Sequence, residues 1–136
     1  MKTIGTEEHF VTDEVVTAWG RLGSPARDDS RASTPPGELG ERLREVGPRR
    51  IASMDEAGLD VQVISLTSPG LHSLSADEAT RLQVETNDRI AELVNAHPDR
   101  FQGFATLATP APAAAAHELE RAVTKLGLHG ALLRWE

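Results

Sequence analysis

The run Val61-Gln62-Val63-Ile64-Ser65-Leu66 constrains the fold of this chain more than any other stretch. It is rich in β-branched residues and has hardly any polar alternation, which is typical of a strand buried on both faces. Strands of that kind occur in parallel sheets whose faces are covered by helices. Residues 48–58 before it are predicted to form a short helix, because Pro48 suits a first helical position and Gly58 a C-terminal cap. The chain is therefore predicted to be an α/β protein.

A second helix and strand follow in the same order. Ser75 and Glu78 have the spacing of a capping box, which predicts a helix start. The helix carries an apolar face and is expected to end at His97-Pro98, where proline prevents its continuation. Residues 101–107 are predicted to form the next strand.

The last unit repeats this alternation. Thr109 is predicted to cap a helix that begins at Pro110, and residues 130–134 are predicted to form a fourth strand. Residues 2–10 form the first strand in this scheme. Strands that alternate with helices indicate a parallel sheet with right-handed crossovers.

Residues 12–47 are predicted to form a long loop, because this stretch is rich in Gly, Pro, Ser, Asp and Arg. Loops of this length in a compact domain are usually lids or binding loops. Trp19 and Leu22 are the apolar side chains that can tuck it over a pocket, which makes Trp19 a candidate substrate contact. Leu39, Leu43 and Val46 can form a short amphipathic turn or two inside it. The alternative is a partly disordered insertion.

The stretch Thr6-Glu7-Glu8-His9-Phe10 contains the candidate metal ligands. Alternate residues of a strand point to the same side, so Glu7 and His9 share one face, about 6.5 Å apart, while Glu8 faces the other way. A carboxylate oxygen and an imidazole nitrogen suit Zn²⁺, Mn²⁺ or Fe²⁺. The alternative is that both glutamates are solvated charges and His9 is an ordinary polar residue.

Thr67, Ser68 and His72 follow the second strand. In parallel βα folds the carboxyl ends of strands carry the site, so these side chains are candidate substrate contacts. The alternative is turn chemistry at residues 67–70.

Composition excludes several classes of function. A formal net charge of −7 argues against nucleic acid or an anionic membrane as partner. The chain has no cysteine, which excludes disulfides and thiol chemistry. No apolar run approaches the roughly 20 residues of a membrane span. At 136 residues the chain has the size of one domain, 1–136, and a cytoplasmic location is expected.

Several ordered motifs resemble the amidohydrolase-related family, in its branch of aminocarboxymuconate-semialdehyde and dihydroxybenzoate decarboxylases. The resemblance covers nearly the whole chain outside the predicted loop. The motifs are EEHF at 7–10, MDEAGLDVQV at 54–63, SLTSPG at 65–70, ND at 87–88, AHPDRF at 96–101, GFA at 103–105 and LGLHGA at 126–131.

The resemblance implies a metal-dependent TIM barrel in which Glu7 and His9 bind a divalent metal, zinc or alternatively manganese. It also implies a small carboxylic acid as substrate. The expected reaction is non-oxidative decarboxylation of an aromatic or unsaturated acid, or hydrolysis as in sister groups. A metal at the carboxyl face of a barrel can stabilise the negative charge that develops in either reaction.

The length of the chain departs from that fold, because a TIM barrel has eight strands and about 250 residues. The four predicted strands correspond to the first half of such a barrel. The family's remaining ligands, a histidine and an aspartate, have no counterpart here. We expect the chain to self-associate or to pair with a complementing C-terminal half, since an open sheet leaves edges unpaired. The alternative is a non-catalytic, truncated half-barrel or an incomplete gene product.

A third reading is a flavodoxin-like domain that binds a small molecule. It predicts a glycine-rich phosphate loop after the first strand, and the sequence has none there.

Overall fold

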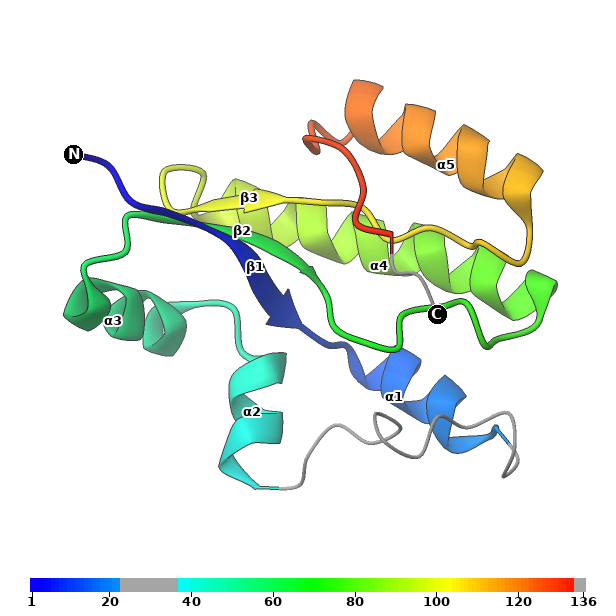
Figure 1. Ribbon diagram of the computed structural model, residues 1–136, viewed down its shortest axis with the longest axis horizontal. Helices are drawn as coiled ribbons and strands as arrows, with labels where there is room; N and C mark the ends of the chain where they lie inside the picture. Colours follow the sequence, from blue (N-terminus) through cyan, green and yellow to red (C-terminus); the bar gives the residue numbers. More distant parts are fainter. Residues whose placement is uncertain (23–36, 134–136) are drawn as a thin grey trace.

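A parallel sheet with helices packed along it makes up the computed structural model, which describes residues 1–22 and 37–133 (Figure 1). The elements are β1 (Ile4–Phe10), α1 (Asp13–Gly20), α2 (Glu38–Arg44), α3 (Pro48–Ala57), β2 (Val61–Leu66), α4 (Ala76–Ala96), β3 (Phe101–Gly103) and α5 (Pro112–Thr124). The predicted alternation of strands and helices is confirmed, and the fold is α/β.

The strands lie in the order β1-β2-β3 and are parallel. All six residues of β2 are buried, as the apolar run predicted for a central strand. The register of β1 against β2 shifts between Gly5 and Glu8, where β1 carries one residue more than β2. This irregularity lies beside the candidate metal ligands, where bulges often re-aim side chains.

Pairing beyond β3 is short. Ala105 and Ala131 form an isolated parallel bridge, in which the Ala105 amide donates to the Gly130 carbonyl at 2.8 Å. The Leu132 amide donates in turn to the Ala105 carbonyl at 3.1 Å. The predicted fourth strand is thus reduced to one bridge in the described part of the chain, and its Arg134 lies outside the described residues.

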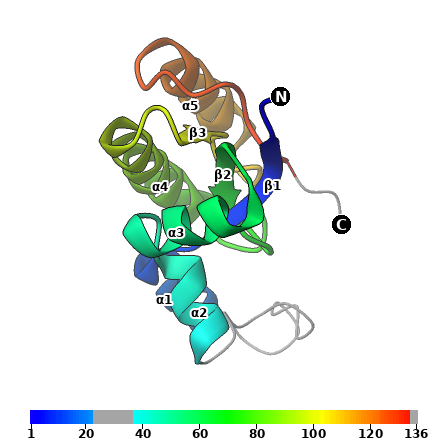
Figure 2. The same ribbon diagram turned by 90° about the vertical axis from the view of Figure 1, so that its left-hand side faces the viewer.

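Helix α4 runs beside the strands in the opposite direction, and α5 lies next to it (Figures 1 and 2). Ser75 caps α4 by accepting from the Glu78 amide at 3.3 Å, as predicted. At Gly103 the strand and helix approach closely, because a Cβ there would collide with the Ile90 side chain. The apolar face of α4 joins β2 in the core, with Ala79, Leu82, Ile90 and Leu93 among its buried residues.

The prediction of a long loop at residues 12–47 is wrong for Asp13–Gly20, which form α1, whereas the amphipathic turn predicted around Leu39 and Leu43 is confirmed as α2. Helix α1 begins after Thr12, whose Oγ1 accepts from the Val15 amide at 3.3 Å. Val15, Ala18 and Trp19 then bury one face of the helix. Tertiary burial of this short apolar face outweighs the loop-like composition of the stretch. The remainder of the predicted loop, residues 23–36, lies outside the described residues.

Helix α5 also begins later than predicted. Its first residue is Pro112, and the N-cap residue Ala111 makes no capping bond through its side chain. Thr109 and Pro110 therefore belong to the preceding turn. Among the helices of the described residues, none is both long and apolar enough to cross a bilayer.

Candidate functional site

The carboxyl ends of β1 and β2 meet at one edge of the sheet. Three consecutive pairs join them: Glu8 with Ile64, His9 with Ser65 and Phe10 with Leu66. The Thr67 amide donates to the Phe10 carbonyl at 2.9 Å and extends this contact beyond β2. Parallel strands present their carboxyl ends together, so the two predicted clusters of site residues lie side by side.

His9 lies against the second strand. Its Nδ1 is 3.1 Å from Ser65 Oγ, and Ser65 is only 1% exposed. A hydrogen bond on one ring nitrogen fixes the orientation of an imidazole, and metal-binding histidines are commonly oriented in this way. Ser65 therefore has the position of a residue that orients a metal ligand.

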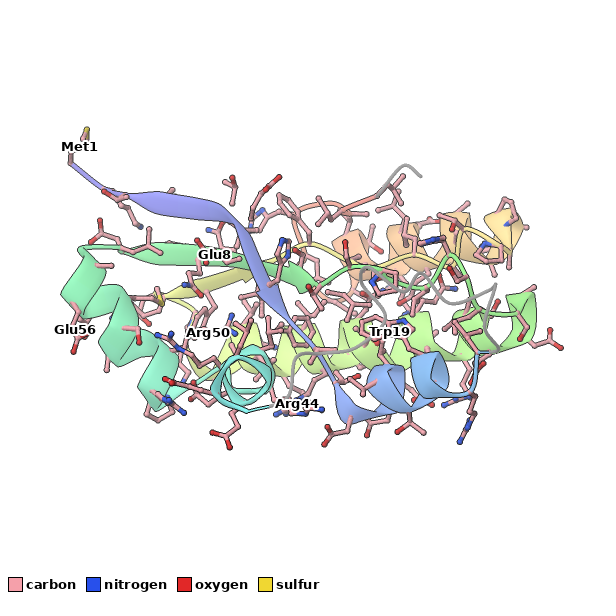
Figure 3. All side chains as sticks on the ribbon, turned by 60° about the horizontal axis from the view of Figure 1, so that its bottom comes forward. Met1, Glu8, Trp19, Arg44, Arg50 and Glu56 are labelled. Atoms are coloured by element: carbon pink, nitrogen blue, oxygen red, sulfur yellow. The ribbon has the colours of Figure 1, made fainter. Side chains whose placement is uncertain are left out.

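Glu7 and Glu8 differ in their surroundings. Glu7 is exposed and lies two residues before His9 in β1. Glu8 pairs with Ile64, a residue of the hydrophobic core. Together with Arg50 of α3, Glu8 lines a groove of about 480 Å³; both residues are labelled in Figure 3. The prediction that Glu7 and His9 share one face of the strand, with Glu8 on the other, stays a prediction: His9 pairs with Ser65, and Glu8 and His9 both line the groove.

The Arg50 side chain is held at this groove. Its Nε donates to the Glu45 carbonyl and its Nη2 to the Arg42 carbonyl, both at 2.9 Å. Burial lowers the pKa of Arg50, while the charges of Glu45 and Glu8 raise it. Glu8 thus belongs to the electrostatic surroundings of α3, which separates its role from that of Glu7.

Glu7 and His9 of β1 remain the predicted metal ligands. Within residues 1–22 and 37–133 no three His, Asp or Glu side chains gather closely enough to hold an ion. The donor types of the two residues fit a borderline divalent cation such as Mn²⁺ or Zn²⁺. A catalytic site of this kind usually needs three protein ligands, so these two residues would supply only part of one.

The loop after β2 carries the other predicted residues. Thr67 and Ser68 are half-buried, and His72 Nδ1 lies 2.7 Å from the Pro69 carbonyl oxygen. A cavity of about 30 Å³ opens beside them, and its lining includes Gly70, His72, Thr106 and Leu132. His72 therefore faces the chain that follows β3, whereas Thr67 continues the pairing of β2 with β1.

Trp19 has a different position from the one its prediction implies. Its side chain is only 2% exposed, and its Nε1 donates to the Gly70 carbonyl at 2.8 Å (Figure 3). Trp19 is thus packed in the core, and its hydrogen bond attaches the loop after β2 to helix α1. Contact with a substrate would require this loop to move, so the structure supports a positioning role.

Three residues have contacts that the sequence did not predict. Ser65, near the end of the second strand, is a candidate polar contact from its position, but only the register shows that it meets His9. Gln83 and Asn87 stand on the buried face of α4, where polar side chains among apolar ones are the available signal.

The sequence pattern of the amidohydrolase family matches residues 9–134. Gamma-resorcylate decarboxylase from a Polaromonas species is 37% identical over 134 residues, which are 96% of this chain and 38% of that protein. The protein of the same name from Rhodococcus jostii is 36% identical and is covered over 37% of its length. The chain thus spans less than two fifths of these curated relatives.

Solved structures agree in fold. A 5-carboxyvanillate decarboxylase from Novosphingobium aromaticivorans, complexed with manganese and a nitrobenzoic acid, superimposes with a TM-score of 0.90 at 34% identity. The match covers 99% of this chain and 42% of that one. A dihydroxybenzoic acid decarboxylase from Polaromonas, with manganese and the inhibitor 2-nitroresorcinol bound, gives a TM-score of 0.78 at 34% identity.

The fold and the ends of β1 and β2 define the class: an α/β protein that corresponds to the N-terminal part of a TIM-barrel hydrolase-like fold. The chain belongs to the amidohydrolase family.

Proposed function

We propose that this chain takes part in the metal-dependent, non-oxidative decarboxylation of an aromatic carboxylic acid. The observation that carries the proposal is the pairing of His9 with Ser65 beside Glu7, in a chain whose relatives are named as decarboxylases of such acids. Glu7 and His9 would hold the metal, with Ser65 orienting the imidazole.

The reaction class sets what the site must do. The bond between the ring carbon and the carboxylate breaks, its electron pair stays on the ring carbon, and a proton takes the place of the released CO₂. A bound divalent cation supplies electrostatic stabilisation of the charge that develops. The described residues contribute orientation of the ligands and the loop after β2, which would border the substrate through Thr67, Ser68 and His72.

Manganese is the metal that we propose in place of zinc. Both solved relatives described above carry manganese, and oxygen-rich sites completed by carboxylates suit it. Hydrolysis stays the alternative reaction, since another solved structure with 31% identity is named as a putative amidohydrolase. Location in the cytoplasm stays a prediction.

The direct test is turnover of 2,6-dihydroxybenzoate by the purified chain with added Mn²⁺. The expected products are 1,3-dihydroxybenzene and CO₂, measured by chromatography and by trapping of the gas. Chelation of the metal and His9→Ala should each abolish product, whereas His129→Ala, at an exposed histidine, should not. A folded, Mn²⁺-loaded chain that gives no product above the blank would contradict independent catalysis.

A second candidate is a partial barrel that works only in association. Ile4, on the edge strand β1, is 50% exposed, and Leu133, after the Ala105–Ala131 bridge, is 56% exposed. Apolar residues on unpaired edges favour association, and the described residues supply only part of a metal site. Light scattering after gel filtration distinguishes a monomer from self-association, and a complementing C-terminal half would restore turnover that the chain alone lacks.

A further inference from the structure

The chain that leaves β3 is bonded to side chains of helix α4. The Thr106 amide donates to Asn87 Oδ1 at 2.8 Å, and Asn87 Nδ2 donates back to the Thr106 carbonyl at 2.9 Å. Two residues later the Ala108 amide donates to Gln83 Oε1 at 2.8 Å. Two amide side chains thus satisfy backbone groups that a neighbouring strand would otherwise satisfy.

The spacing explains why these positions work together. Four residues of helix advance by about 6 Å, and two residues of extended chain advance by about 6.6 Å. Side chains at 83 and 87 share one face of α4, so each reaches an alternate residue of the segment beside it. The order is reversed, Asn87 to Thr106 and Gln83 to Ala108, because α4 runs against the strands.

Burial makes these bonds strong constraints. Asn87 is 0% exposed and Gln83 is 1% exposed, and each would be left with unsatisfied polar atoms if the segment moved. Residues of helix α5 also accept hydrogen bonds from these two side chains. Glu118 Oε1 accepts from Asn87 Nδ2 at 2.9 Å, and the Ala114 carbonyl accepts from Gln83 Nε2 at 3.3 Å.

The segment held in this way borders the candidate site. Thr106 and Leu107 line the small cavity at the strand ends, together with His72 and Gly70 of the loop after β2. Ala105, directly before, makes the bridge to Ala131 on the other side. A displacement of residues 106–108 would therefore change the wall that faces His72.

We propose that Gln83 and Asn87 are positioning residues. They fix the position of residues 106–108, which follow β3, and thereby the wall of the substrate site formed by Thr106 and Leu107. The role rests on the proposed function for its catalytic consequence. The side chains act through backbone groups and not through contact with reacting atoms.

The test uses near-isosteric variants that remove only polar atoms, Asn87→Leu and Gln83→Met, with Asn95→Leu at an exposed position of α4 as control. Site-resolved hydrogen exchange should show the Thr106 amide exchanging about tenfold faster in Asn87→Leu, and the Ala108 amide about tenfold faster in Gln83→Met. The Gln62 amide, bonded to the Arg100 carbonyl, serves as the internal reference. Equal acceleration at Gln62 would overturn the local role.

The functional readout is binding of 2-nitroresorcinol in the presence of Mn²⁺, followed by its absorbance. Each of the two variants should raise the Kd about tenfold, the size expected for one lost buried hydrogen bond, whereas Asn95→Leu should leave it unchanged. Faster local exchange with an unchanged Kd would overturn the positioning role. A parent chain and control variant that both fail to bind, alone and with a complementing C-terminal half, would instead overturn the proposed function, and this role with it.

Hydrogen exchange of the parent chain keeps the test decisive if the apolar variants do not fold. The Thr106 and Ala108 amides, held by buried side chains, should exchange at least as slowly as the Gln62 amide of the sheet. Exchange at Thr106 and Ala108 more than about tenfold faster than at Gln62 would show that Asn87 and Gln83 do not hold the segment.

Discussion

His9 and Ser65 are paired across β1 and β2, and the hydroxyl of Ser65 is the group that the imidazole Nδ1 faces, 3.1 Å away. Loss of a residue that orients a metal ligand typically lowers metal affinity by about 10–100-fold. Ser65→Ala is therefore expected to weaken Mn²⁺ binding by at least about tenfold. Titration followed by the electron paramagnetic resonance of free Mn²⁺ measures this, with Thr124→Ala, which removes an exposed hydroxyl of α5, as control. Equal affinity in the two variants would contradict the role of Ser65.

The ligands themselves form the second test. Glu7→Ala and His9→Ala should each reduce Mn²⁺ binding below detection, because two ligands already make an incomplete site. Glu14→Ala, an exposed acid in the first turn of α1, controls for the loss of charge. His129→Ala controls for the loss of an imidazole. Unchanged stoichiometry in both ligand variants would show that the metal, if bound, lies elsewhere.

Trp19 offers a test of the loop after β2. Trp19→Phe keeps most of the buried volume but removes the donor to the Gly70 carbonyl, so the free energy of unfolding should fall by about 1 kcal/mol. Trp19→Ala should cost about 3–5 kcal/mol, because it also leaves a cavity. Urea denaturation followed by circular dichroism gives both values. Equal losses for the two variants would mean that the hydrogen bond, and not the volume, dominates.

Arg121 should contribute more to stability than an exposed arginine. Its Nη2 lies 2.8 Å from Oε1 of Glu118, a residue only 4% exposed, and its Nη1 lies 2.8 Å from Asp88 Oδ1. Breaking a buried pair costs about 3–5 kcal/mol. Because Arg121 is itself one-third exposed, Arg121→Ala should lower the free energy of unfolding by about 2 kcal/mol after allowance for solvent screening. Arg89→Ala, which breaks an exposed pair with Glu92, should cost about 0.5 kcal/mol.

The stability that Arg121 contributes depends on pH with a definite sign. The hydrogen bond with Glu118 raises the pKa of Arg121 above its ordinary value, and the bond with Asp88 adds to this. A raised pKa gives stability that is fully present below the pKa of the unfolded state. This stability is lost only as the pH rises through the pKa of the folded state. The difference between the parent chain and Arg121→Ala should therefore be constant from pH 7 to pH 10. A decline within that range, measured by urea denaturation, would contradict the assignment.

Local patterns in the sequence were enough for most of the elements. The apolar run at 61–66, Gly58 and the Ser75–Glu78 spacing each act through neighbours in the chain, and they predicted β2, α3 and the start of α4. The period of two also predicts that Glu7 and His9 share a face, which stays a prediction because the register of β1 shifts between Gly5 and Glu8. By contrast, α1 was missed, because its stability comes from burying Val15, Ala18 and Trp19 against distant residues.

By itself, then, the sequence determined the α/β class, the family and the chemical types available at the end of β1. Only the tertiary structure decided which partner each group meets: Ser65 for His9, Gly70 for Trp19 and Thr106 for Asn87. The physical reason is that strand register and helix packing join residues between 19 and 56 positions apart, and no local pattern records which of them come together.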